Sequence, residues 1–437
     1  MDVTAPDRTP ANGGLGRNSD KIGPVSDLIS IDDARSRVLD AVTRLGDEDV
    51  PLDLALGRVL AEHVTSAIDV PPFDNSGMDG YALIAGPEAE LEVIGEARAG
   101  HPAAEALRPG TAIRISTGAV VPEGANAVVP VERTTAVKGA KLHSLQVDRD
   151  MRGKPGESRV TVPETKPGAN VRRAGEDISV GAVVLQRGTV LGPAELGVAA
   201  SVGRPTLRCA RRPRVFVLIT GDELTPPGEP LAPGGIYGSN GFALAAQVER
   251  AGGALAGRST VPDTPEATRT ALREALDAAD VVIVSGGVSV GPHDHVKDAL
   301  RDLGVEERFW GVRLRPGKPT WFGARGDTLA FGLPGNPVSA MVTFQLFARP
   351  ALAALQGAPP DAARASAVLA HAVARNPRRD ETVRVKLRHT EEGLVAEPTG
   401  AQGSHMLTSM VGADGLALIN HGDGELAAGE RVEVELL

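Results

Sequence analysis

The chain has 437 residues, a length that predicts about two to four domains, and it carries a net charge of −10. Because its longest basic run is only Ala210–Arg214, nucleic acid and anionic membranes are excluded as the main partner. The lone cysteine, Cys209, excludes an intrachain disulfide or a CxxC site, and the sequence shows no signal peptide or long apolar stretch, so we expect a soluble, cytoplasmic protein.

The first elements are a tail and a helix. Residues 1–24 are rich in Gly, Pro, Asn and charge, and this composition predicts a disordered tail. From Ser30, a candidate N-cap, apolar residues recur at helical spacing up to Leu45, which predicts an amphipathic helix. A short helical connection is expected over about 52–61.

The residue pattern then changes to short runs rich in β-forming residues, separated by Gly and Pro turns. The clearest runs within residues 68–165 are Leu91–Ile94, Ala112–Ser116, Ala127–Pro130 and Leu145–Val147. They predict an inserted β domain. Residues 166–208 add a strand at Ala182–Leu185 and a helix that starts with Pro193.

From Val215 strands alternate with helices. Strands are expected at Val215–Thr220, 255–261, Val281–Ser285 and Thr328–Leu333, and helices at 240–252, 265–278, 295–303 and from Pro337 to about Leu355. This alternation predicts a doubly wound parallel sheet. Alternating strands at Val383–Leu387 and Arg431–Leu436 then predict a small C-terminal β domain.

A glycine-rich turn follows the buried strand Val281–Ser285. It contains Gly286, Gly287 and Gly291, with hydroxyls at Ser285 and Ser289. At the carboxyl edge of an α/β sheet such a turn can surround an anion with backbone N–H groups. It matches neither standard phosphate fingerprint, so the alternative is that these glycines only let the chain turn.

Acidic side chains follow three of the predicted strands: Asp222 and Glu223, Asp263, and Asp294. Since the carboxyl ends of parallel strands share one edge, these acids are expected to converge and to favour Mg²⁺ beside a phosphate. Asp222 and Asp263 could instead be cap or turn residues. His293 and His295 flank Asp294, but their spacing points them in different directions, which disfavours a histidine metal site.

Two further clusters lack a periodic explanation. Arg313, Arg315 and Lys318 suit an oxyanion clamp together with Arg379 and Ser404, although alternate arginines could also be the solvent face of a strand. Three polar loops carry hydroxyl, carboxylate and guanidinium groups without building a core, and could equally be connections. They are Pro71–Tyr81, which includes Asp79, Ser116–Ala119, which includes Thr117, and Arg172–Asp177.

These segments resemble one known family. PPFDNSGMDGYA, STGA, NVRRAGED, TGDEL, SGGVSVG, RPGKP, GLPGNPVSA and QGSHML follow in the order of the molybdopterin molybdenumtransferases, represented by bacterial MoeA and the gephyrin E domain. The similarity covers about residues 28–437 and implies a multidomain fold of α/β plus β class. Its parts would be a helical lever region (25–67 and 166–208), the inserted β domain (68–165), a doubly wound α/β domain similar to molybdopterin adenylyltransferases (209–357) and a C-terminal β domain (358–437).

The resemblance also implies a reaction. Adenylylated molybdopterin and molybdate are the substrates, a Mg²⁺-dependent step hydrolyses the pyrophosphate linkage, and molybdenum cofactor and AMP are the products. The family forms an elongated homodimer, and a molybdopterin adenylyltransferase and cofactor delivery proteins are further candidate partners. The alternatives are an adenylyltransferase activity and a non-catalytic scaffold of the gephyrin type. Sequence does not decide between molybdate and tungstate.

The resemblance places roles on individual residues. Catalytic roles are implied for Asp79, Thr117, Asp177, Glu223, Asp263 and Asp294, of which Glu223 and Asp294 are the expected Mg²⁺ ligands. Nucleotide phosphate is expected at Ser285, Gly286, Gly287, Ser289 and Gly291, and molybdate at Arg315, Lys318, Arg379 and Ser404. Further binding positions are Arg172, Pro334, Asn336 and Pro337.

The chain departs from the family pattern at several positions. Gly77 replaces a frequent Ala and His295 a frequent Tyr, while Gly311 stands where some members have Lys. Arg315 replaces a common Lys, which makes the expected clamp more arginine-like. The family's usual Gly is missing before Arg378 and Arg379, so either could be its anion-site arginine, and we choose Arg379.

Overall fold

The computed structural model describes residues 28–136, 159–289, 294–391 and 393–437. The chain divides into two compact units, one made of the residues up to Asp47 together with Ala210–Leu437, the other of Glu48–Cys209. The tail expected at 1–24, the strand expected at Leu145–Val147, Gly291 and His293 lie outside the described residues.

The first unit contains a mixed six-stranded sheet in the order β16-β13-β17-β21-β20-β18. The predicted parallel strands are β13 (Arg214–Thr220), β16 (Ala254–Val261), β17 (Val281–Ser285) and β21 (Thr328–Leu333). Antiparallel β20 (Trp321–Arg325) and β18 (Glu306–Trp310) complete one edge. The order of the parallel strands turns around at β13 and β17, where such sheets bind ligands.

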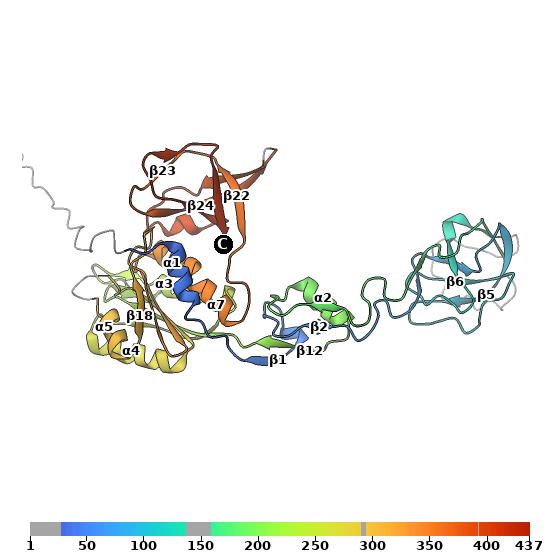
Figure 1. The fold of residues 1–437 in the computed structure, drawn as a ribbon, viewed down its shortest axis with the longest axis horizontal. Helices are drawn as coiled ribbons and strands as arrows, with labels where there is room; N and C mark the ends of the chain where they lie inside the picture. The colour runs from blue at the N-terminus through green and yellow to red at the C-terminus, as the bar shows by residue number, and fades with distance from the viewer. Residues whose placement is uncertain (1–27, 137–158, 290–293, 392) are drawn as a thin grey trace, which may run out of the picture. The chain divides into compact units, whose positions relative to one another are not determined.

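Helices cover both faces of this sheet, as the doubly wound prediction requires (Figure 1). Alternate residues of β17 face opposite sides, so Val281 and Ile283 belong to one core and Val282 and Val284 to the other. The first core contains α1 (Ile31–Leu39), α3 (Asn240–Arg250), α6 (Pro337–Thr343) and α7 (Arg349–Leu355); the second contains α4 (Pro265–Ala278) and α5 (Val296–Asp302).

Two of these helices carry local signals that the sequence shows. Ser30 caps α1, because its hydroxyl accepts a hydrogen bond from the Asp33 amide at 3.0 Å. A π-helical turn, Phe344–Ala348, joins α6 to α7. The helix Pro337–Leu355 is long and apolar enough to cross a membrane, but 78% of its most apolar window is buried inside the structure, as in a core helix.

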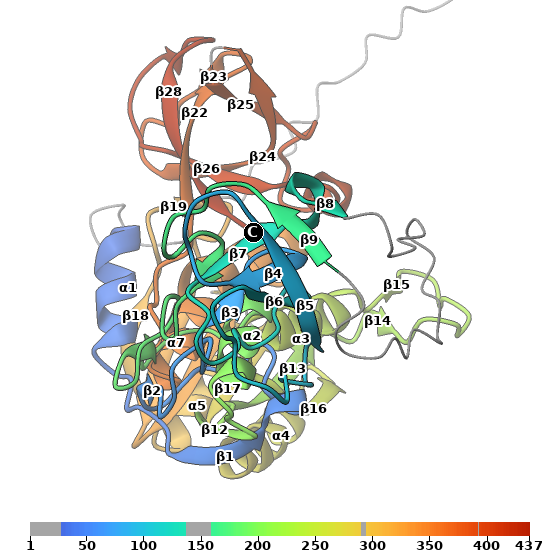
Figure 2. The same ribbon diagram turned by 90° about the vertical axis from the view of Figure 1, so that its right-hand side faces the viewer.

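The C-terminal part of the first unit is a closed barrel (Figure 2). Its strands run β24-β25-β22-β28-β26, and β26 pairs with β24 as well as with β28, which closes the ring. The bounds are β22 (Arg364–Leu369), β24 (Asp380–Thr390), β25 (Gly393–Pro398), β26 (Gly415–Ile419) and β28 (Arg431–Leu436). A short strand from the α/β part, β19 (Leu314–Arg315), extends the sheet beside β24.

The second unit contains the inserted β domain and a smaller mixed region. The β domain is a six-stranded sheet in the order β7-β4-β6-β5-β9-β8. Its strands are β4 (Gly80–Leu83), β5 (Ala89–Ala97), β6 (Thr111–Ile115), β7 (Ala127–Pro130), β8 (Thr135–Ala136) and β9 (Arg159–Val162). The mixed region contains α2 (Pro193–Ser201) and three short strand pairs: β1 (Asp47–Pro51) with β12 (Thr206–Ala210), β2 (Val64–Thr65) with β11 (Val183–Leu185), and β3 (Asn75–Ser76) with β10 (Val171–Arg172).

Two expectations differ from the structure in this part of the chain. The helical connection expected over 52–61 is wrong beyond Leu54, because Gly57 has a φ of +71° and Leu60 forms a β-bridge. Helix α1 was expected to join the lever region but packs through Ala34 and Val38 on the α/β core.

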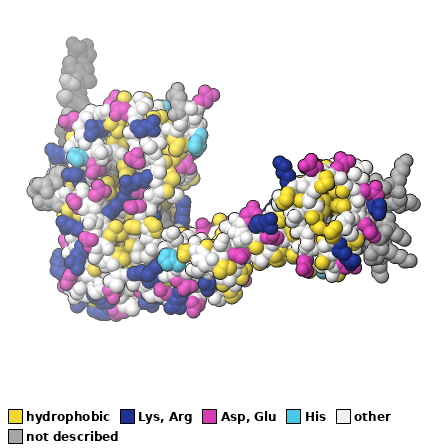
Figure 3. Space-filling model, turned by 45° about the vertical axis from the view of Figure 1, so that its right-hand side comes forward, with side chains coloured by type: hydrophobic (Ala, Val, Ile, Leu, Met, Phe, Trp, Pro, Cys, Tyr) yellow, Lys and Arg dark blue, Asp and Glu magenta, His cyan; other side chains and the backbone are white. Residues whose placement is uncertain are grey.

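The surface shows charges of both signs. On the face drawn in Figure 3, Lys and Arg side chains are interspersed with Asp and Glu side chains.

Candidate functional site

Three loops meet at the carboxyl ends of β13, β17 and β21. The Gly286 amide donates to the Leu333 carbonyl at 3.1 Å, and Gly286 and Gly287 have φ values of +100° and +66°. A Cβ atom on Gly286 would lie 2.7 Å from Thr220 Oγ1, so any larger residue would push the loops apart. The glycines therefore set both the turn and the close approach of the loops.

The buried side chain of one asparagine connects two of these loops through hydrogen bonds. Asn240, the first residue of α3, donates from Nδ2 to Ser285 Oγ at 3.0 Å and to the Gly335 carbonyl at 2.7 Å. Ser285 Oγ donates in turn to the Pro334 carbonyl at 3.0 Å, and this serine is only 1% exposed. The Ser285 hydroxyl is thus used inside the protein, which assigns it the task of holding the loops, while the backbone of Gly286 and Gly287 forms the turn.

The strand-end acids converge, as their placement in the sequence predicts. The Asp263 amide donates to Asp222 Oδ1 at 3.0 Å. Burial raises the pKa of the Asp263 carboxyl, and the negative charges of Asp222, Glu223 and Asp294 raise it further. An acid with three acidic neighbours stores repulsion that a cation relieves.

The donor set fits a hard divalent cation in part. In the described residues no group of three or more His, Cys, Asp or Glu side chains is placed to hold a metal by itself. Mg²⁺ commonly takes only one or two carboxylates and completes its shell with waters and substrate phosphates. Glu223 and Asp294, whose charges both act on Asp263, supply oxygen donors of that kind.

A hollow lies next to the glycine turn. Its volume is about 340 Å³, and its lining includes Ser289, Asp294, Lys297 and Trp310. The Trp310 indole donates to the Val288 carbonyl at 3.0 Å, and the Lys297 ammonium lies 4.6 Å from the centre of the indole ring. Predicted site residues Ser289 and Asp294 therefore face a space in which a ligand can lie.

The cationic cluster is assembled by the pairing of β19 with β24. This register sets Leu314 opposite Asp380 and Arg315 opposite Glu381, and Arg315 Nη1 lies 2.7 Å from Glu381 Oε1. Burial lowers the pKa of the Arg379 guanidinium, and the charge of Arg315 lowers it further. Arg315 and Arg379 are therefore electrostatic neighbours.

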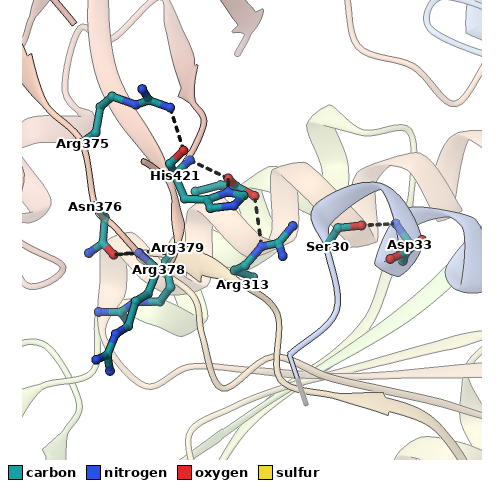
Figure 4. A network of polar contacts seen from close by, with 9 residues as sticks. Ser30, Asp33, Arg313, Arg375, Asn376, Arg378, Arg379 and His421 are labelled. Atoms are coloured by element: carbon teal, nitrogen blue, oxygen red, sulfur yellow. Dashed lines mark hydrogen bonds and ion pairs between the residues drawn. The ribbon is translucent and has the colours of Figure 1, made fainter. Parts of the chain in front are cut away.

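A polar network holds the start of β24 (Figure 4). The Asn376 side chain accepts hydrogen bonds from the amides of both Arg378 and Arg379. Asp380 then lies 2.7 Å from His421 Nδ1 and 3.9 Å from Arg313 Nε. Arg378 is exposed, whereas Arg379 is half-buried beside Arg315.

Lys318 and Ser404 occupy two further turns of this unit. The Lys318 carbonyl accepts from the Val312 amide at 2.9 Å, which closes the turn after Arg315. The Ser404 carbonyl accepts from the Val338 amide at 3.1 Å, in the first turn of α6. Asn336 and Pro337 start that helix, so the short segment Pro334–Val338 contacts Ser285 at one end and the Ser404 loop at the other.

The second unit gathers its own predicted residues. Asp79 Oδ1 accepts from the Thr117 amide at 2.7 Å, and β3 and β10 set Arg172 opposite Asn75. The Asp177 amide donates to the Val70 carbonyl. The three polar loops of this unit therefore form one surface that exposes Asp79, Thr117 and Arg172.

The surroundings of three positions that depart from the family pattern can be compared. A Cβ at Gly77 would make ordinary contacts, 3.4 Å from the Asn170 carbonyl and 3.7 Å from Arg172 Nε, so glycine is not required there. Gly311 has a φ of +90°, and its Cβ would lie 2.7 Å from Leu28 Cδ2, so a lysine would be strained. His295 precedes α5 without a side-chain capping bond.

The sequence analysis did not identify Asn240, whose side chain connects the loops after β17 and β21 by hydrogen bonds. Its only signal is a polar Ser-Asn-Gly run at the start of a predicted helix. In the sequence such a run cannot be distinguished from a helix N-cap. The residues that Asn240 contacts lie 45 and 95 positions away in the chain. Only the packed sheet reveals its partners.

Comparisons with known proteins agree along nearly the whole chain. Residues 29–203 match the MoeA N-terminal region (domain I and II), residues 216–354 a probable molybdopterin binding domain, and residues 366–437 the MoeA C-terminal region (domain IV). Curated relatives include the molybdopterin molybdenumtransferase of Haemophilus influenzae, 36% identical over 93% of this chain and 98% of the relative. Another is molybdopterin molybdenumtransferase 2 of Mycobacterium tuberculosis, 39% identical over 88% of this chain and 94% of the relative.

Solved structures give the same result. The chain is similar to the molybdopterin biosynthesis MoeA protein of Pyrococcus horikoshii, with a TM-score of 0.74 and 32% identity over 94% of this chain and 99% of that one. The three matched regions, the identity to these relatives and the shared fold together show the family. The chain belongs to the MoeA family of molybdopterin molybdenumtransferases.

Proposed function

We propose that this protein inserts molybdenum into molybdopterin, using adenylylated molybdopterin and molybdate and releasing AMP in a Mg²⁺-dependent step. One observation carries the proposal: Pro334–Val338 connects Ser285, at the start of the glycine turn, to the loop that holds Ser404. A nucleotide phosphate and a small oxyanion can therefore occupy adjoining parts of one unit. The reaction needs that arrangement, because the pterin must meet molybdate while its pyrophosphate is cleaved.

The acidic side is assigned to the pyrophosphate. Water adds to the phosphoanhydride, the bond between the two phosphoryl groups breaks, and AMP leaves while the pterin keeps its phosphate. A bound Mg²⁺ would neutralise phosphate charge there, with Glu223 and Asp294 as its protein ligands. The amides of the glycine turn orient the phosphates, and Asp263, whose pKa burial and its acidic neighbours raise, is suited to hold a proton.

The cationic side is assigned to molybdate. A tetrahedral dianion needs several donors that stay in place while its oxygens are replaced. Arg315 and Arg379 supply planar forks, Lys318 a point charge, and Ser404 a hydroxyl. The half-buried position of Arg379 beside Arg315 supports this assignment.

The second unit is assigned to the same reaction across a homodimer. Asp79, Thr117 and Arg172 form a polar surface that their own unit does not use for a core, and Asp177 is exposed in the same unit. In the family's dimer this surface would meet the α/β part of the partner subunit. A cytoplasmic location, with a molybdopterin adenylyltransferase and cofactor delivery proteins as partners, completes the proposal.

Incubation of the purified protein with adenylylated molybdopterin, molybdate and Mg²⁺ tests the proposal. We expect AMP release together with a cofactor that reconstitutes a molybdoenzyme. Consumption of ATP with molybdopterin would instead indicate an adenylyltransferase, and the absence of both reactions would indicate a scaffold.

Asp294→Asn removes one assigned Mg²⁺ ligand, so the Mg²⁺ dependence of AMP release should change in this variant. An unchanged Mg²⁺ dependence would contradict the metal assignment.

A further inference from the structure

Arg384 is a completely buried arginine in the C-terminal barrel. It lies in β24 with 0% exposure. Its neighbours Val383 and Val385 point into the barrel core, so Thr382 and Arg384 point to the opposite face. Leu416, which pairs with Arg384 across the strands, packs with the core of the α/β part. Arg384 is therefore buried on the barrel face that the α/β part covers.

Within the described ranges, the Arg384 guanidinium has only neutral hydrogen-bond acceptors. Nε donates to Ser409 Oγ at 3.1 Å, while the two remaining nitrogens reach the carbonyls of Gly403 and Thr382 at 3.4 and 3.5 Å. These last two distances are longer than an ordinary N–H···O bond. Among the described residues Arg384 forms no ion pair with a carboxylate, and the neighbouring Thr382 hydroxyl is buried without a hydrogen-bond partner.

Burying the charge of Arg384 costs free energy. Burial lowers the pKa of Arg384 to about 10, so the side chain still carries its proton at neutral pH. A buried cation without a nearby anion is unfavourable, and the field it creates in a medium of low polarity attracts negative charge. A protein that needs only a structural tie here could use a neutral amide. The retained charge therefore calls for an anion that the described part of the chain does not itself provide.

The contacts of Arg384 lead to the Ser404 loop. Its side chain binds the Gly403 carbonyl, its amide donates to Gln402 Oε1 at 2.9 Å, and its carbonyl accepts from the Thr399 amide at 3.0 Å. Ser404 follows directly and holds the first turn of α6 through Val338. Arg384 thus fixes the loop that carries one of the residues assigned to molybdate.

We propose that Arg384 is a positioning residue for the oxyanion substrate, because it clamps the Gln402–Ser404 loop and its unneutralised charge favours a dianion bound at that loop. This inference rests on the proposed function, since the oxyanion is the molybdate assigned to Ser404. Arg384 does not touch the dianion. It acts through the loop geometry and through the field of its charge.

The test compares Arg384→Met, which removes the charge at similar length, with Arg384→Lys, which keeps the charge without the fork. Arg349→Met is the matched control, since Arg349 is also desolvated but donates to the Pro360 carbonyl and has Glu435 near it. For each folded variant the half-saturating molybdate concentration for AMP release is measured. AMP binding is measured separately by titration calorimetry.

We expect Arg384→Met to raise the half-saturating molybdate concentration about tenfold or more, with AMP affinity unchanged within about twofold. Arg384→Lys should recover part of this loss, and Arg349→Met should lower the unfolding temperature without the molybdate effect. The inference is overturned if Arg384→Met stays within about twofold of wild type, if molybdate and AMP weaken equally, or if Arg384→Lys is no better than Arg384→Met.

A second variant and a wild-type measurement complete the test. Where Arg384→Met does not fold, Ser409→Ala removes the partner of Arg384 Nε with a small change in volume, and it should raise the molybdate requirement about two- to fivefold. An unchanged requirement in Ser409→Ala overturns the inference. A wild-type protein whose AMP release ignores molybdate contradicts the proposed function itself, which separates the two failures.

Discussion

At the scale of single residues, the two charged clusters differ in how their charges are balanced. At the sheet edge, burial raises the pKa of Asp263, and repulsion by the neighbouring acids raises it further. The arginines of the other cluster are partly neutralised, Arg315 by Glu381. The first cluster therefore gains most from a bound cation, and the second keeps enough positive charge for an anion.

Asp263 gives a pH prediction. A carboxyl whose pKa is raised on folding holds its proton more tightly in the folded protein than in the unfolded chain. Its charge therefore destabilises the fold. This effect grows as the pH rises from the ordinary aspartate pKa of 3.8 through the raised pKa of the folded protein, and it is complete above that. Without Mg²⁺, Asp263→Asn should raise the unfolding temperature at pH 7 by about 1–3 °C and have less effect near pH 3.5.

Thermal unfolding at both pH values measures this difference. The control is Asp327→Asn, an exposed acid at the opposite end of β21, which should show no such pH dependence. A destabilised Asp263→Asn at pH 7 would mean that the hydrogen bonds of this carboxyl outweigh the repulsion.

Lys318 gives a prediction about ligand preference. Its ammonium is assigned to the small dianion, so Lys318→Ala should raise the half-saturating molybdate concentration more than it weakens binding of the adenylylated pterin. A five- to tenfold rise, or about 1 kcal/mol, is expected for one charge-assisted contact. Equal losses for both ligands would place Lys318 on the pterin phosphate instead.

At the scale of elements, one amide joins a helix start to two loops. Asn240→Ala would leave the Gly335 carbonyl without its side-chain partner and remove the donor to buried Ser285, which should cost about 1–3 kcal/mol of unfolding free energy. Because the same bonds align the glycine turn, AMP affinity should fall by a larger factor than molybdate affinity. Denaturant unfolding and ligand titration measure the two effects.

The control for this prediction is Gln247→Ala on the same helix, which removes a hydrogen bond to the Met341 carbonyl away from the loops. It should lose stability without a selective loss of AMP. An Asn240→Ala protein of full nucleotide affinity would show that the glycine turn keeps its shape without the amide.

Element prediction from sequence succeeded where pattern and local signals agree. The strand Val281–Ser285 is a continuous apolar run, and α4 begins at Pro265 behind Thr264, whose hydroxyl caps it. The antiparallel strands β18 and β20 were missed, because Glu306–Trp310 is largely charged and exposed and gains its strand structure from pairing with β20.

At the scale of the whole molecule, the proposal that two subunits share the site leads to a complementation experiment. Asp79→Ala and Asp294→Ala should each be inactive as homodimers. After random subunit exchange, half of the dimers are mixed and each has one of two sites intact, so the mixture should recover about a quarter of wild-type activity.

Exchange is confirmed by differently tagged subunits, and the matched mixture is Asp294→Ala with Lys318→Ala. Both of these residues lie in the same unit, so in a mixed dimer one site carries Asp294→Ala and the other carries Lys318→Ala. This mixture should therefore show no more than the average activity of its two parents. A mixture of Asp79→Ala with Asp294→Ala that stays inactive despite exchange would place the site within one chain.

The sequence by itself determined the parallel sheet, the β insertion, the acids at strand ends and the family, because apolar period, glycine turns and ordered motifs are local properties of the chain. Tertiary structure decided which side chains meet. The contacts of Asn240 with Ser285, of Ser404 with Val338 and of Arg384 with Gly403 join residues from different elements. No local pattern encodes them, since they depend on strand order and on closure of the barrel, which bring distant segments of the chain together.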